Sequence, residues 1–170
     1  MKKYLPLFIL MIFIASCGPS IEPLTQQEIE QEKQAVIDVI KAYNKASQEK
    51  DFAGILPTLA DNVVFFGTDS AEVIKNLNEF KAKITEQFNE VDEMRIGEMT
   101  DVSVIIDPYG NFASVIYGMP LTVVIDNVME KMFVRVARTL KKEDGRWVIV
   151  SGIIGVARGT SSAVADTLSQ

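Results

Sequence analysis

The chain has 170 residues, of which 48% are hydrophobic and 24% charged, so it suits one globular domain and is unlike a disordered chain. Seventeen basic residues stand against 23 acidic ones, and this negative balance argues against nucleic acid as a partner. One cysteine excludes an internal disulfide, and the absence of histidine removes the commonest metal ligand and general base, so we expect no cofactor and no metal.

The first residues have the pattern of an export signal. Lys2 and Lys3 precede an apolar run over 4–14, which is about half the ~20 residues that a membrane-spanning helix needs. The run ends in Ile14-Ala15-Ser16-Cys17, which resembles the lipobox of bacterial lipoproteins. The alternative is an ordinary secretory signal with an incidental cysteine.

The lipobox resemblance implies a division of the chain into a signal peptide, a lipidated tether, one domain and a flexible C-terminal tail, over 1–16, 17–24, 25–158 and 159–170. Cys17 would then carry the lipid that holds the protein to a membrane of the cell envelope. Without Lys2 and Lys3, 15 basic residues face 23 acidic ones, a net charge of −8. Gly18 resembles the residue of outer-membrane-sorted lipoproteins, which implies an anchor facing the periplasm if the host has two membranes.

Capping and helical spacing predict the first half of the domain. Thr25 and Glu28 form a capping box before apolar residues at helical spacing, and Asp51 can cap a short second helix. Thr68 and Asp69 are expected to cap a third helix, with Glu72 in its first turn. The predicted helices cover about 25–50, 51–59 and 71–89, with a strand over 62–66.

From Met94 onward the apolar period changes from 3.6 to 2, which predicts strands. Short turns, such as Glu143-Asp144-Gly145, make these strands antiparallel neighbours. Helices followed by a meander predict an α+β fold, with three N-terminal helices packed on one face of a curved antiparallel sheet. The predicted strands cover about 95–107, 112–125, 129–141 and 147–157.

Both faces of the late strands are apolar, whereas a sheet with one solvated face would alternate apolar and polar residues. Because three helices can cover only one face, we expect a homodimer through the other. The alternative is a monomer with a hydrophobic outer face.

The order of elements resembles the SnoaL-like branch of the nuclear transport factor 2-like superfamily. Three stretches carry the resemblance, namely 63–72 with its Gly67-Thr68-Asp69 turn, Arg135-Val136-Ala137, and the hairpin 143–150 with Trp147. The resemblance implies a cone-shaped, cystatin-like fold with a pocket at one end and dimers formed sheet to sheet. Where this branch commonly has histidines on its last strand, this chain has Ser151 and Ile153.

Several side chains could line such a pocket. Arg135 offers planar donors to a carboxylate or phosphate, unless it pairs with a structural carboxylate such as Asp101 or Glu98. Tyr117 and Trp147 could wall the pocket or fill the core, and Ser151 would join them. Ser151 has no histidine to activate it, which excludes a catalytic triad.

Three hypotheses for function follow. The preferred one is a non-enzymatic, lipid-anchored domain that binds a small, mostly apolar ligand, or assembles as a dimer, or does both. The second is an isomerase, cyclase or dehydratase of the SnoaL type, with Asp101 or Glu98 as the base. The third is a structural partner of another envelope protein.

Overall fold

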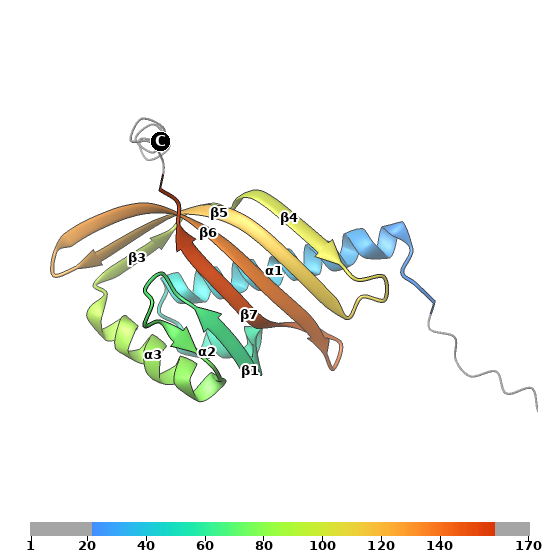
Figure 1. Ribbon diagram of the computed structural model, residues 1–170, viewed down its shortest axis with the longest axis horizontal. Helices are drawn as coiled ribbons and strands as arrows, with labels where there is room; N and C mark the ends of the chain where they lie inside the picture. Colours follow the sequence, from blue (N-terminus) through green and yellow to red (C-terminus); the bar gives the residue numbers. More distant parts are fainter. Residues whose placement is uncertain (1–21, 159–170) are drawn as a thin grey trace, which may run out of the picture.

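The computed structural model describes residues 22–158, which fold into helices followed by one sheet (Figure 1). The expected signal peptide, Cys17 and the C-terminal tail lie outside these residues. The helices come first in the chain, apart from two early strands. They are α1 (Gln26–Gln48), α2 (Phe52–Ile55), the 3-10 turn η1 (Leu56–Thr58) and α3 (Leu77–Glu90).

Helix α1 begins where the capping box predicts. The Thr25 hydroxyl accepts a hydrogen bond from the Glu28 amide, and the Glu28 carboxylate accepts one from the Thr25 amide at 2.8 Å. Val36 and Ile40 are fully buried against the sheet, so the amphipathic pattern points inward as expected. Asp51 then caps α2 by accepting from the Gly54 amide, which confirms the short second helix.

Helix α3 begins later than the sequence predicts. Its N-cap is Asn76, which accepts a hydrogen bond from the Glu79 amide at 2.9 Å. The assignment of Thr68 and Asp69 as its caps, with Glu72 in its first turn, was therefore wrong. Instead the Glu72 carboxylate accepts hydrogen bonds from the amides of Thr68 and Asp69, which closes a turn before the helix.

That turn brings a two-residue strand, β2 (Val73–Ile74), back against β1 (Leu59–Phe66). The apolar residues Val73 and Ile74 gave these positions a helical appearance in the sequence. They belong to a sheet edge because Glu72 satisfies the turn amides before a helix can start.

All seven strands form one sheet with the order β2-β1-β7-β6-β5-β3, and β4 also pairs with β5. All neighbouring pairs are antiparallel except β1 and β7, which are parallel. The antiparallel meander was predicted, and the parallel contact was not. The late strands are β3 (Glu93–Ile96), β4 (Thr100–Ile106), β5 (Phe112–Ile125), β6 (Val128–Glu143) and β7 (Arg146–Val156).

The single strand predicted over 95–107 is two strands, and Pro120 on β5 supplies the reason. Proline has no amide hydrogen, so it cannot donate in the middle of a ladder. Strand β3 pairs with β5 beyond Pro120, and β4 pairs with β5 before it. Gly97 lies between β3 and β4 and donates its amide to the Pro120 carbonyl at 2.8 Å. A side chain at Gly97 would press on the proline ring.

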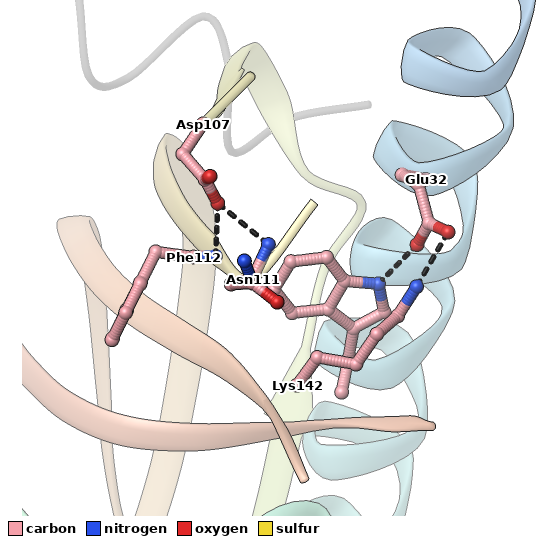
Figure 2. Close-up of polar contacts among 6 residues, drawn as sticks. Glu32, Asp107, Asn111, Phe112 and Lys142 are labelled. Atoms are coloured by element: carbon pink, nitrogen blue, oxygen red, sulfur yellow. Dashed lines mark hydrogen bonds and ion pairs between the residues drawn. The ribbon is translucent and has the colours of Figure 1, made fainter. Parts of the chain in front are cut away.

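A turn held by one carboxylate joins β4 to β5. Asp107 accepts hydrogen bonds from the amides of Asn111 and Phe112 (Figure 2) and from the amide of Tyr109. The chain before α1 reaches the same turn, because the Leu24 amide donates to the Pro108 carbonyl at 2.7 Å. The beginning of the domain is therefore attached to the β4–β5 end of the sheet.

The core lies between the helices and the inner face of the sheet (Figure 1). On β6 the inner face holds Val134, Val136 and Leu140, none of which is more than 1% exposed. The outer face keeps several apolar side chains in solvent, including Ile105, Phe112, Ile116 and Ile153. Among residues 22–158 no helix is long and apolar enough to cross a membrane.

Candidate functional site

A groove of about 550 Å³ opens between α1 and the β3–β4 connection. Its polar side chains come mainly from one side of α1, and its apolar side chains come mainly from β3, β4 and the loop between them. The lining residues are Gln34, Ile37, Lys41, Asn44, Lys45, Gln48, Ile96, Gly97, Glu98, Met99 and Val102.

The groove carries two positive charges and one negative charge, from Lys41, Lys45 and Glu98. Lys45 lies 3.9 Å from Glu49, and its side chain is 74% exposed, so this ion pair is weak. Lys41 makes no ion pair within the described part of the chain. The Gln48 side chain accepts a hydrogen bond from the Ile96 amide at 2.7 Å and so holds the two walls together.

A second hollow, between β2 and α3, is less suited to a ligand because its charged groups already have partners. It is lined by Glu72, Glu79, Glu86 and Lys83 among others. Glu72 closes its turn, Glu79 accepts from the Lys75 amide, and Glu86 pairs with Lys83 at 2.8 Å. We therefore take the groove along α1 as the candidate site.

The four predicted ligand-binding residues do not meet in one place, because the sheet separates them. Arg135 is exposed, and Ser151, paired with Thr139, lies on the same outer face. Tyr117 and Trp147 lie on the inner face and are 1% and 5% exposed. Successive side chains of a strand point to opposite faces, so Arg135 cannot share a pocket with Tyr117 from this register.

Trp147 connects the last hairpin to α1 through Glu32, which Figure 2 labels. Its indole nitrogen donates to the Glu32 carboxylate at 2.6 Å, and the Lys142 ammonium donates to the other oxygen of Glu32 at 2.5 Å. Burial opposes ionisation of Glu32, but the hydrogen bonds from Lys142 and Trp147 outweigh it and hold the pKa of Glu32 below its usual value. Trp147 thus has a structural role in the described fold.

The two candidate bases occupy different surroundings. Glu98 is exposed and lines the groove, whereas Asp101 is exposed at an irregularity in β4, with a φ of 51°. Neither accepts a hydrogen bond from a residue within 22–158, and neither pairs with Arg135. No group of three potential metal-ligating side chains occurs among the described residues.

The sequence reasoning missed Arg138, which is 8% exposed. Arg138 has the same parity on β6 as Val134, Val136 and Leu140, so strand alternation alone places it on the core face. Gly152 on β7 was a second indication, because this residue without a side chain pairs directly with Arg138.

The fold is shared by many solved structures. A candidate scytalone dehydratase from Novosphingobium aromaticivorans superimposes with a TM-score of 0.71 at 9% identity, covering 82% of this chain and 93% of that one. An uncharacterised protein with a cystatin-like fold from Caulobacter vibrioides gives 0.67 at 11% identity, covering 82% and 99%. A candidate ketosteroid isomerase from Shewanella frigidimarina gives 0.62 at 18% identity, covering 73% and 97%.

At these identities the similarity establishes the fold, which is the nuclear transport factor 2-like cone that the sequence predicted. No curated protein matches the chain. A family model for the SnoaL-like domain matches residues 36–157, which include α1 from Val36 onward and every strand. The chain therefore belongs to the SnoaL-like domain family.

Proposed function

We propose that this domain binds a small molecule with an apolar body and an anionic group in the groove between α1 and β3–β4. The observation that carries the proposal is the groove itself, with about 550 Å³ of space and a lining that is apolar on one side and basic on the other. Pockets for small ligands typically have a volume of this order, with a few polar groups that fix orientation.

The chemistry of the groove favours this class of ligand. Ile37, Ile96 and Met99 offer apolar surface to the body of the ligand, and Lys41 and Lys45 offer two ammonium groups to its anion. These lysines keep their charge available because Lys41 has no ion pair within residues 22–158 and Lys45 has a weak one. The preference for an anion is local, since the chain as a whole is acidic.

The probe that tests this proposal is 1-anilinonaphthalene-8-sulfonate, which combines an aromatic body with a sulfonate. We expect saturable fluorescence enhancement, with binding weakened about tenfold in the K41Q/K45Q double variant, as loss of charged hydrogen bonds implies. Lys131→Gln, an exposed lysine near the β5–β6 turn, is the matched control and should bind normally. Equal binding by the double variant and the control would rule out the groove as the site.

Anchoring of this domain to a membrane through Cys17 is the second part of the proposal. Leu24 is attached to the β4–β5 turn, so a lipid on Cys17 would hold this end of the sheet within about 25 Å of the bilayer, given the reach of seven extended residues. Cys17→Ser should move the protein from the membrane fraction to the soluble fraction. Continued membrane retention of this variant would contradict a lipid anchor.

Pairing of two copies through the outer sheet face is the third part. Phe66, Ile153 and Ile116 lie in one row across β1, β7 and β5 and are 48%, 54% and 55% exposed. An apolar row across the centre of a sheet is typical of an interface. Sedimentation velocity should show a dimer that Ile153→Glu dissociates, whereas Met129→Glu at the β5–β6 turn should not. A monomeric wild-type protein at high concentration would refute this part.

An enzymatic function is the alternative, and one observation favours it, namely that Glu98 lines the same groove as Lys41 and Asn44. A carboxylate beside polar side chains can act as a base for proton transfer, as expected of an isomerase or dehydratase. Absorbance assays with a β,γ-unsaturated ketosteroid compare the wild type with Glu98→Gln. Turnover that disappears in the variant supports catalysis, and equal rates argue against Glu98 as a base.

A further inference from the structure

One charged side chain lies in the core of this domain. Arg138 is 8% exposed, and among residues 22–158 it is the only charged residue that is buried. A buried charge is costly unless hydrogen bonds and a counter-ion compensate it.

The guanidinium of Arg138 crosses from β6 toward β1. Arg138 pairs with Gly152 on β7, and Gly152 pairs with Phe65 on β1, so the three residues form one row on the inner face. A Cβ atom at Gly152 would lie 2.2 Å from Nη1 of Arg138, and glycine is thus what leaves room for the side chain. The guanidinium carbon ends 4.5 Å from the centre of the Phe65 ring and 5.2 Å from that of Tyr43.

The two rings attract the cation but provide no hydrogen-bond acceptor. Nε of Arg138 is buried without a hydrogen-bond partner, and no carboxylate of residues 22–158 forms an ion pair with the guanidinium. The buried Tyr117 hydroxyl lies beside Arg138 and Asn44, but within residues 22–158 it makes no hydrogen bond of good geometry. A buried cation without a carboxylate, next to a hydroxyl that is poorly satisfied, requires a physical explanation, because buried polar groups are nearly always satisfied.

Arg138 and Tyr117 lie on adjacent strands, because Tyr117 pairs with Val136, two residues before Arg138. Burial raises the pKa of Tyr117, although Arg138 and Asn44 oppose this, so the hydroxyl keeps its proton and can donate at neutral pH. Asn44 lies beside Tyr117 and also lines the groove, so this one side chain connects the cluster with the groove.

We propose that Arg138 and Tyr117 form a binding site for a carboxylate group, separate from the lysines of the groove. A carboxylate can accept two parallel N–H donors from the planar guanidinium, and the tyrosine hydroxyl adds a third donor. The guanidinium carbon lies over the rings of Phe65 and Tyr43, and such cation–π contacts do not use the N–H donors of the guanidinium. The site goes beyond the groove proposal, since it does not require Lys41 or Lys45.

Two sources of the carboxylate can be distinguished by choice of probe. Sodium acetate represents a small free acid, and sodium decanoate represents the acid end of a longer ligand whose chain lies in the groove. Acetate binding should be unaffected in the K41Q/K45Q variant. If the groove proposal fails while Arg138 still binds acetate, the two ideas are separated.

The most direct measurement is the Nε–Hε signal of Arg138 in ¹H–¹⁵N spectra of the purified protein, assigned with an Arg138→Lys variant. The chain has five arginines, so the spectrum is simple, and exposed Arg135 serves as an internal control. We expect acetate or decanoate to shift the Arg138 signal saturably at millimolar concentrations or below, and to leave Arg135 unchanged. Tyr117→Phe, which removes one oxygen, should weaken binding about fivefold to tenfold.

A second measurement guards against poor folding of the lysine variant. If Arg138 is a buried cation without a counter-ion, Arg138→Met should raise the melting temperature in low salt, because it removes that charge. The same variant should abolish the stabilisation by added carboxylate. Arg135→Met should do neither. The proposal is overturned if neither probe moves the Arg138 signal saturably, or if Arg138→Met and wild type respond equally to added carboxylate.

Discussion

The contact between Glu32, Trp147 and Lys142 allows the sharpest test of how this fold is held together. Within residues 22–158, Glu32 is the only acceptor for the indole nitrogen and for the Lys142 ammonium, at 2.6 and 2.5 Å. It connects α1 to β6 and β7, which are more than 100 residues away in the chain. Replacing Glu32 therefore removes a long-range contact and leaves a buried donor behind.

The size of the effect follows from the burial of the three side chains. Trp147 is 5% exposed, so its unpaired indole nitrogen costs about 1–3 kcal/mol. The ion pair with Lys142 adds about 1 kcal/mol or less, because both side chains are roughly one quarter exposed. We expect Glu32→Ala to lower the free energy of unfolding by about 1–4 kcal/mol, with a fall in melting temperature of roughly 3 °C per kcal/mol.

Urea unfolding followed by fluorescence of the single tryptophan measures this change. The matched control is Glu30→Ala, because Glu30 belongs to the same helix and pairs with Lys33 at 2.7 Å on the exposed side. That variant should lose no more than about 0.5 kcal/mol. If Glu32→Ala loses no more free energy of unfolding than the control, the contact of Glu32 with Trp147 and Lys142 contributes nothing to stability and the argument from burial is wrong.

Three further predictions concern capping, a turn and pH. Asn76→Ala should destabilise the protein by about 1 kcal/mol in urea unfolding, while Thr68→Ala should have a small effect, because Asn76 caps α3. Asp107→Ala should cost about 1–3 kcal/mol and broaden the amide signals of the β4–β5 turn, since three amides lose their acceptor. Burial raises the pKa values of Glu32 and Asp107, but hydrogen bonds lower them by more, so both pKa values lie below their usual values. The stabilisation from these carboxylates is therefore complete above about pH 4.5 and is lost as the pH falls through the lowered pKa values. The free energy of unfolding of Glu32→Gln should accordingly depend less on pH in that acid range than that of wild type, and an unchanged pH profile would contradict the assigned shift.

Much of the local structure could be predicted because short-range chemistry determines it. The capping box of Thr25 and Glu28, the cap at Asp51 and the antiparallel order of the late strands all depend on residues close in sequence. The start of α3 was misplaced because Glu72 could serve either a helix or a turn, and only its contacts with the Thr68 and Asp69 amides distinguish the two.

The candidate site was less predictable, since it depends on which faces meet. Glu98 was named as a candidate base and lines the groove, but Lys41 and Lys45 appeared in the sequence only as the polar side of an amphipathic helix. Their role arises because the β3–β4 connection passes beside α1. Arg135 seemed the natural anion-binding residue, and the register places it in solvent instead.

By itself the sequence determined the α+β plan, the long first helix, and the turns and alternation of the late strands, because each arises from hydrogen bonds and apolar spacing within a few residues. Tertiary structure decided that β1 lies parallel beside β7, that Pro120 divides β3 from β4, and that Arg138 is buried between Phe65 and Tyr43. These features depend on contacts between segments far apart in the chain, and the spacing of residues within one segment does not determine which distant segment a side chain will contact.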